Sequence, residues 1–423
     1  MSAVDESTAA STSAAVARRL LASTLGGRAT DLARDRFAAP LRPAASLGVL
    51  DITEFFGETS GGVRTYLMEK AAYVERHPEL RQVLVLPAGA DAVTEVDGVR
   101  CYRMRGPRVP TQHPYRFMLA TRSNRRIIEH ERPDVIEVGS PGLVPWIIRH
   151  PARRLGIPLV HFFHSDYPSL MGPGIARKLA ARYARALDRL FVTTIVASTT
   201  VADDLRRIGI DRVVRVPLGV DPRCFSPTRR ARGMELRARL GIDGTPLVIF
   251  VGRFAREKEL KLLLTAWPTI RARTGAQLLL VGEGPLRRPL LESIRRHAWS
   301  RSIRWFPFTA DREQLASLVA ASDLFVSPGT AETFGLAALE ALASGTPVLS
   351  ADHGGVAEQV TASGAGALFP AGQATELAAA AVALLSTGGA EMRERARAYA
   401  TSEHDWDSVF DRIVNLYRAV SGR

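Results

Sequence analysis

Cysteine is scarce in this sequence, whose 423 residues include only Cys101 and Cys224. Two cysteines form no disulfide framework and suit a reducing compartment such as the cytoplasm. No apolar run reaches about 18 residues, so no membrane-spanning helix is expected. Long acidic tracts and Gln/Asn-rich tracts are also missing, and the composition is that of a globular protein. We therefore expect a cytoplasmic protein, at most peripheral at the inner face of a membrane.

Positive charge dominates, with a formal net charge of +13. Such a charge favours anionic partners: phosphorylated small molecules, nucleic acid or an anionic membrane surface. Basic residues gather in the N-terminal half at Arg103, Arg105 and Arg108, and again at helical spacing at Lys178, Arg182, Arg185 and Arg189. The second group is either a solvated helix face or a membrane contact. Aromatic residues are not interleaved with these positions, so we expect no nucleic-acid partner.

The first 45 residues are rich in Ala, Ser and Thr and carry several arginines. This composition predicts a flexible N-terminal extension over 1–45. A basic amphipathic membrane contact and a transit peptide are the alternatives.

From residue 46 onward, short β-branched runs alternate with longer amphipathic stretches, a pattern that predicts parallel sheets covered by helices. The predicted strands are 47–52, 82–86, 99–102, 135–138, 158–162, 193–197, 213–216, 247–251, 277–281, 302–305, 324–326, 348–350 and 367–369. Predicted helices include 63–75, 115–131, 175–190, 259–270, 285–297 and 406–418.

This alternation is interrupted once, by a basic, proline-containing stretch at 222–233 that we interpret as a linker. The fold class is therefore α/β, with two Rossmann-like doubly wound domains facing each other across a cleft. Residues 46–222 form the N-terminal domain and 223–404 the C-terminal domain. A C-terminal helix within 405–423 is expected to pack back on the N-terminal domain.

Ligands of open α/β sheets bind beyond the carboxyl ends of the strands, where the candidate motifs fall. Gly252 follows a predicted strand and allows a sharp turn, and Arg253 and Lys258 place two cations where they can hold one diphosphate. Arg256 is interpreted as a solvated bystander. Gly282-Glu283-Gly284-Pro285 follows another strand and permits a close approach by a ring or ribose, although it is also an ordinary turn.

The stretch "SPGTAETFGLAALEALASG" at 327–345 places two carboxylates, Glu332 and Glu340, around the start of a helix. Free N–H groups at that start, around Thr333-Phe334-Gly335-Leu336, can bind phosphate oxygens. Glu332 would accept hydrogen bonds from a hexose and Glu340 from a ribose. The alternative is a helix-dipole residue and a solvated charge.

The N-terminal domain offers two further candidates. Gly61-Gly62 precedes a helix and lets a phosphate or sugar approach the backbone, unless it is only a flexible turn. His164 follows a strand end and is itself followed by Ser165, Asp166 and Tyr167. His164 is a site candidate, although a lone histidine is often a structural core residue. Asp166 and Tyr167 are weaker candidates as acceptor or sugar contacts, and His161, inside the strand, is interpreted as structural.

Taken together, Gly252-Arg253-x4-Lys258, Gly282-x-Gly284 and Glu332-x7-Glu340 with its Phe-Gly-Leu resemble the motifs of family 4 GT-B glycosyltransferases. The resemblance runs from about residue 47 to 420 and includes "ALASGTPVLSADHGGVAE". It implies that the first glutamate contacts the donor sugar, the second the ribose, and the Arg/Lys pair the diphosphate. It also implies a glycine-rich loop at Gly61-Gly62, a sugar-contacting His164, and transfer with retention of the α configuration.

The only Asp-x-Asp, Asp405-Trp406-Asp407, opens the terminal helix and is interpreted as a cap and a first-turn charge. We therefore predict no metal site and no cofactor besides the substrate, a GDP- or UDP-hexose. Mannose is favoured, and the acceptor partner is a glycan or lipid-linked glycan. Two rivals remain: a sugar-nucleotide epimerase or other GT-B enzyme, and a dinucleotide-binding oxidoreductase, whose Gly-x-Gly-x-x-Gly is poorly matched by "GETSGG".

Overall fold

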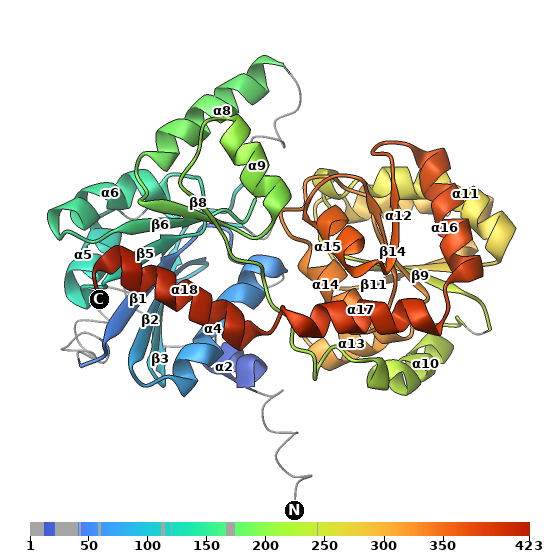
Figure 1. Cartoon of the computed structure of the whole chain (residues 1–423), viewed down its shortest axis with the longest axis horizontal. Coiled ribbons are helices and arrows are strands. Elements are labelled where there is room, and N and C mark those ends of the chain that lie inside the picture. The colour runs from blue at the N-terminus through green and yellow to red at the C-terminus, as the bar shows by residue number, and fades with distance from the viewer. Residues whose placement is uncertain are drawn as a thin grey trace, which may run out of the picture. The chain divides into compact units, whose positions relative to one another are not determined.

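The computed structural model describes residues 12–21, 41, 44–57, 61–110, 115–119, 121–165, 174–242 and 244–423. The chain forms two α/β units (Figure 1). The N-terminal unit comprises the described residues up to Ala197 together with Ala202–Val216 and Val409–Arg423. The C-terminal unit comprises Ser198–Val201 and Pro217–Ser408.

The N-terminal unit is built on an eight-stranded sheet in the order β3-β4-β2-β1-β5-β6-β7-β8. Its strands are β1 (Leu47–Ile52), β2 (Leu80–Ala88), β3 (Ala92–Val96), β4 (Val99–Arg105), β5 (Val135–Val138), β6 (Leu159–Phe162), β7 (Thr193–Val196) and β8 (Val213–Arg215). Every residue of β1, β5, β6 and β7 is buried, which requires cover on both faces of the sheet.

Strand β3 was not predicted, and it is the one strand of this sheet that pairs antiparallel, with β4. Asp97 and Gly98 join the two strands, and both have positive φ, 35° and 90°. An Asp-Gly pair with this geometry is a favoured two-residue hairpin turn. The turn signal was therefore present in the sequence, next to a strand whose apolar run is interrupted by Thr94 and Glu95.

The helices of this unit are α2 (Thr12–Leu21), α4 (Gly62–Arg76), α5 (Thr121–Glu131), α6 (Val144–Arg154), α8 (Ile175–Asp188), the part of α9 (Thr199–Arg207) from Ala202 and the part of α18 (Trp406–Ser421) from Val409. Helix α2 lies in the stretch expected to be a flexible extension. It buries Val16 and Leu20, and Thr94 Oγ1 of β3 donates a hydrogen bond to Leu20 O at 2.7 Å. Arg19 contacts Glu75 of α4 at 2.5 Å.

The predicted helix 115–131 is too long at its start. Residues 115–119 instead pair with the segment after β4: Val109 N donates to Tyr115 O at 3.0 Å, and Phe117 N donates to Pro107 O at 2.9 Å. A Cβ at Gly106 would lie 1.8 Å from Phe117 O, so this pairing also depends on a glycine. The amphipathic sequence pattern therefore continues N-terminal to α5, into residues 115–119, which form backbone hydrogen bonds with another segment.

The C-terminal unit has a six-stranded, wholly parallel sheet in the order β11-β10-β9-β12-β13-β14. Its strands are β9 (Leu247–Val251), β10 (Gln277–Val281), β11 (Ile303–Phe306), β12 (Leu324–Ser327), β13 (Val348–Ala351) and β14 (Gly366–Phe369). Its helices are α10 (Arg230–Arg239), α11 (Leu260–Thr274), α12 (Arg287–Arg295), α13 (Arg312–Ala320), α14 (Leu336–Ala343), α15 (Gly355–Ser363), α16 (Ala374–Thr387) and α17 (Ala390–Ser402).

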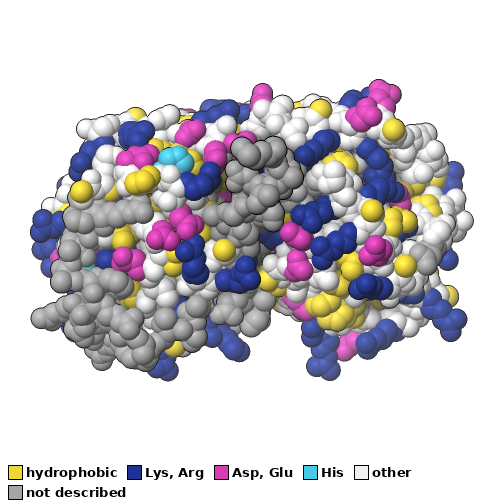
Figure 2. Space-filling view, turned by 90° about the horizontal axis from the view of Figure 1, so that it is seen from below, with side chains coloured by type: hydrophobic (Ala, Val, Ile, Leu, Met, Phe, Trp, Pro, Cys, Tyr) yellow, Lys and Arg dark blue, Asp and Glu magenta, His cyan; other side chains and the backbone are white. Residues whose placement is uncertain are grey.

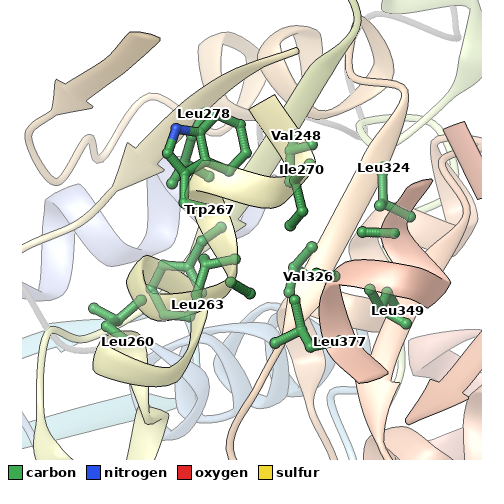
Figure 3. Packing of buried hydrophobic residues seen from close by; sticks show 14 of the residues in the cluster. Val248, Leu260, Leu263, Trp267, Ile270, Leu278, Leu324, Val326, Leu349 and Leu377 are labelled. Atoms are coloured by element: carbon green, nitrogen blue, oxygen red, sulfur yellow. The ribbon is translucent and has the colours of Figure 1, made fainter. Parts of the chain in front are cut away.

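The core of this unit is mainly aliphatic and also contains Trp267 and three phenylalanines, Phe250, Phe254 and Phe369. Trp267 of α11 is fully buried against the leucine- and valine-rich strands, as Figure 3 shows. Its indole Nε1 donates to Ser302 Oγ at 2.9 Å, so the one polar atom of the ring is satisfied. This packing fixes α11 on the sheet and thereby positions the loop that connects β9 to α11.

The predicted linker at 222–233 is partly wrong, because helix α10 begins within it at Arg230. The basic residues make ion pairs: Arg229 and Arg232 contact Glu313, at 3.1 Å and 3.3 Å. A Cβ at Gly233 would lie 1.9 Å from Ser317 O, so α10 packs closely on α13. Their acidic partner Glu313 is distant in sequence. The local sequence therefore showed only a basic cluster, which we interpreted as a linker.

A buried ionic network ties the N-terminal unit to the end of the chain. Lys70 Nζ of α4 lies 2.6 Å from Asp51 Oδ1, 3.4 Å from Glu137 Oε2 and 2.7 Å from Tyr417 Oη of α18. Tyr417 and Tyr66 also donate to Glu137 Oε2. Burial raises the pKa of Glu137 to about 7, while Lys70 opposes that shift. The network joins β1, β5, α4 and α18 at one point.

We expect Lys70→Met to destabilise the N-terminal unit by about 3–5 kcal/mol, because it leaves buried carboxylates without their cation. Thermal and denaturant unfolding of this unit measure the loss. Lys178→Met, on the exposed part of α8, is the matched control and should change stability by less than about 0.5 kcal/mol. Equal stability of the two variants would show that the network contributes nothing.

Candidate active site

The C-terminal unit brings its predicted motifs to one edge of its sheet. Because the strands are parallel, the loops after β9, β10, β12 and β13 all leave from the same edge. The strand order reverses between β9 and β12, where α/β sheets of this kind bind ligands. Lys258 follows β9 and Glu332 follows β12, so both lie in loops that flank this point.

Lys258 and Glu332 form an ion pair: Lys258 Nζ donates to Glu332 Oε1. The two side chains are 21% and 24% exposed, so the pair is reachable from solvent yet partly desolvated. The sequence interpretation assigned Lys258 to a diphosphate and Glu332 to a sugar, and it did not foresee that they contact each other. The fold thus holds a cation and a carboxylate side by side at this edge of the sheet.

Arg253 lies on the same loop as Lys258. Its Nη1 lies 3.7 Å from Glu257 Oε1, a weak ion pair within the loop. Residues Arg256–Lys258 form a short 3-10 helix that ends at Glu259, which has a positive φ of 48°. Arg256 is exposed, as expected of a bystander.

Gly282 and Gly284, in the loop after β10, are needed by the protein itself. Gly252 N donates to Val281 O at 3.1 Å, and Phe254 N donates to Glu283 O at 2.8 Å. A Cβ at Gly282 would lie 2.0 Å from Gly252 O, and a Cβ at Gly284 would lie 2.5 Å from Phe254 O. The loops after β9 and β10 are therefore packed backbone against backbone, and this close approach already accounts for Gly282 and Gly284.

The helix predicted near Phe334 begins at Leu336, as α14. Gly335 precedes it with a φ of 88°, a conformation that favours glycine. The first bonds within the helix run from Ala338 and Leu339 N to Gly335 O, so the N–H groups of the preceding residues lie outside the helical pattern. Phe334 is buried, and its carbonyl accepts from Gln359 Nε2 at 2.6 Å. Thr333 and Leu336 are partly exposed.

Glu340 lies one turn inside α14 and is only 8% exposed. Its Oε1 lies 3.5 Å from Arg312 Nη2, at the start of α13. Arg312 also lies over the Phe225 ring, 5.3 Å from its centroid. The sequence gave no signal for Arg312, which is one basic residue among many. Its contact with Glu340 excludes the alternative that Glu340 is a solvated charge.

In the N-terminal unit the strand order reverses between β1 and β5, and a small pocket lies there. Asp51 and Thr53 from the end of β1, Glu137 and Gly139 from the end of β5, and His164 are among its lining residues. Figure 1 shows β1 and β5 as neighbours in this unit. His164 therefore lies at the point of this sheet where a ligand is expected, beside a gap that is too small to hold a water molecule.

The His164 ring stacks on Phe162 at 4.1 Å and lies 5.3 Å from the Tyr66 ring. Burial, with smaller contributions from His161 and Lys70, lowers its pKa to about 3, so the imidazole is neutral near pH 7. His161 is buried and stacks on Phe191 at 4.8 Å, which supports its structural interpretation. Asp166 and Tyr167 lie outside the described residues.

Gly61 and Gly62 begin α4 and are exposed. A Cβ at either position would meet no atom within 4 Å, in contrast to Gly282 and Gly284. Neither residue has a positive φ. No packing contact within the described residues therefore requires glycine at these two positions.

The terminal Asp-x-Asp is a helix cap. Asp405 Oδ2 accepts from Asp407 N at 3.1 Å and from Ser408 N at 3.2 Å, and Asp407 lies in the first turn of α18. Both interpretations of this motif are confirmed. Among the residues that the structure describes, no helix combines the length and apolarity needed to cross a bilayer.

Two family models match the chain. The model of glycosyl transferases group 1 matches residues 234–403, and that of glycosyltransferase family 4 matches residues 60–223. A GDP-mannose-dependent alpha-mannosyltransferase of Mycobacterium tuberculosis is 33% identical over 385 residues, 88% of this chain and 96% of that protein. A GDP-mannose-dependent alpha-(1-6)-phosphatidylinositol dimannoside mannosyltransferase of the same species is 32% identical over 321 residues, 74% of this chain and 82% of that protein.

Solved structures share the fold. Sucrose-phosphate synthase from Thermosynechococcus elongatus has a TM-score of 0.73 at 20% identity, covering 89% of this chain and 99% of that one. Anabaena HepE in complex with UDP-glucose has a TM-score of 0.70 at 19% identity, covering 88% and 100%. With the motifs at the sheet edges, these matches establish that the chain belongs to the family 4 GT-B glycosyltransferases.

Proposed function

We propose that this enzyme transfers mannose from GDP-mannose to a hydroxyl group of a glycan or lipid-linked glycan, with retention of the α configuration. The observation that carries the choice of donor is the 33% identity, over 96% of its length, to a GDP-mannose-dependent alpha-mannosyltransferase. The second relative, named for transfer to phosphatidylinositol dimannoside, supports a lipid-linked acceptor. Retention is what the family resemblance implies.

The Lys258–Glu332 pair gives the donor site a physical basis. On donor binding, Lys258 Nζ turns from the carboxylate to the diphosphate, and Glu332 accepts hydrogen bonds from hexose hydroxyls. Before binding, each charge compensates the other, so neither is exposed without a partner in a partly desolvated loop. Arg253 and the N–H groups around Gly335 and Leu336 complete the diphosphate site, and Glu340, beside Arg312, binds the ribose.

Catalysis in this proposal is electrostatic. The bond between the anomeric carbon and the diphosphate oxygen breaks while the acceptor oxygen bonds to that carbon, on the face that the nucleotide leaves. The acceptor's proton passes to an oxygen of the departing diphosphate. Arg253 and Lys258 stabilise the negative charge that develops there, the interaction that is usually largest in such sites. A neutral His164 offers a hydrogen bond to the transferred sugar without adding charge.

A thermal-shift panel of GDP-, UDP- and ADP-hexoses, with and without Mg²⁺, tests the donor assignment. We expect GDP-mannose to raise the Tm most, by the mass-action stabilisation of a bound ligand, and to do so equally without Mg²⁺. A larger shift with a UDP-sugar would overturn the nucleotide assignment, and a shift that needs Mg²⁺ would overturn metal independence.

Substitutions at the ion pair separate the two roles. Lys258→Ala should lower kcat by about 10²–10³-fold, because a charge on the leaving group loses its stabilisation. Glu332→Ala should leave GDP binding near that of the wild type, while GDP-mannose binds no more tightly than GDP in calorimetry. Arg256→Ala, on the same loop, is the control and should remain active. Near-normal turnover of Lys258→Ala would contradict the role.

Alanine substitutions distinguish ligand-facing glycines from structural ones. Gly62→Ala should leave the Tm unchanged or slightly raised, because alanine favours helices, yet should reduce transfer, because a ligand approaches that backbone. Gly284→Ala should lower the Tm, because its Cβ would collide with Phe254 O. Gly389→Ala, where a Cβ has room, is the control. Full activity of Gly62→Ala would remove the N-terminal loop from the site.

A further inference from the structure

Helix α8 (Ile175–Asp188) presents an apolar ridge to solvent. Ile175, Leu179 and Tyr183 are spaced four residues apart and therefore share one face of the helix. They are 77%, 61% and 38% exposed. The helix buries only Ala184 and Leu187, near its C-terminal end. Its first turns extend beyond the rest of the N-terminal unit in Figure 1. A helix of a globular protein normally turns such a ridge toward the core.

A basic stripe runs directly beside this ridge. Lys178, Arg182 and Arg185 follow one another at spacings of four and three residues, and all three are exposed. Between Ile175 and Ala184 the helix contains no acidic residue. On the face shown in Figure 2, by contrast, Lys and Arg side chains are interspersed with Asp and Glu.

The ridge continues onto helix α6 (Val144–Arg154). Tyr183 Oη donates to Pro141 O at 2.5 Å and accepts from Trp146 Nε1 at 3.1 Å. Leu143, beside Pro141, is 50% exposed, and the Arg149 guanidinium lies 5.5 Å from the Trp146 ring centroid. The α8 surface is defined here as one set of residues: Leu143, Trp146, Ile175, Lys178, Leu179, Arg182 and Tyr183.

We propose that the α8 surface docks on an anionic lipid bilayer. A helix that presents apolar side chains beside lysines and arginines lies in a membrane interface, with the apolar residues among the acyl chains and the cations at the headgroups. Charge complementarity favours this occupant over a second copy of the chain, because a net charge of +13 repels its own copy.

Docking through the α8 surface deepens the proposed function, because it brings the enzyme to the membrane that carries a lipid-linked acceptor. That part rests on the proposed function, whereas docking itself does not, because the α8 surface contains no residue of the C-terminal unit, where the donor is proposed to bind.

Co-sedimentation of the full chain with vesicles tests the proposal. We expect binding to vesicles that contain phosphatidylglycerol, weaker binding at high salt, and little binding to pure phosphatidylcholine. Ile175→Ser/Leu179→Ser and, separately, Lys178→Ser/Arg182→Ser should each lower the partition coefficient about tenfold or more. The matched controls lie in the C-terminal unit: Met234→Ser for the ridge, and Arg288→Ser/Arg295→Ser for the stripe, with exposed side chains in each case. These should bind as the wild type does.

Vesicle binding that is equal in all variants, or absent in the wild type, would overturn the proposal. Loss of self-association in the ridge variant, measured by analytical ultracentrifugation without vesicles, would assign the α8 surface to a second copy instead. Thermal shifts with GDP-mannose are measured on the same variants and should be unchanged. A failed donor assignment would abolish those shifts in the wild type while leaving vesicle binding intact, so the two failures are distinguishable.

Discussion

The ion pair between Lys258 and Glu332 is the interaction on which the account of the donor site depends. It forms where the strand order of the C-terminal sheet reverses, between β9 and β12, because the loops after these strands leave the same edge. The loop after β9 is held there by the backbone contacts of Gly282 and Gly284 and by the packing of α11 through Trp267. The fold thus places a cation and a carboxylate side by side.

The N-terminal unit holds its candidate site by a different means. A buried lysine with two carboxylates and two tyrosines lies beneath the pocket that His164 lines, and one of the tyrosines comes from the last helix of the chain. Burial makes this network costly to break, since removing the cation leaves charge unpaired. The C-terminal helix α18 thereby becomes part of the scaffold of a site formed by residues more than two hundred positions earlier.

Most of the fold could be predicted from the sequence, because parallel strands buried on both faces read as short continuous apolar runs, as β1 and β9 do. Strand β3 was missed because Thr94 and Glu95 interrupt its apolar run, so the clearest local signal for it is the Asp-Gly turn that follows. The candidate site residues that follow strands could be identified from the sequence, but the side chains that contact them could not. Arg312 contacts Glu340, and Lys258 contacts Glu332, across sequence separations that carry no local signal.

A crystal structure with GDP-mannose bound tests the central claim most directly. The account predicts that the diphosphate lies within hydrogen-bonding distance of Lys258 Nζ and the Arg253 guanidinium. It also predicts that Glu332 accepts from hydroxyl groups of the hexose instead of from the lysine. A diphosphate bound away from the carboxyl ends of β9 and β12, with the Lys258–Glu332 pair unchanged, would contradict it.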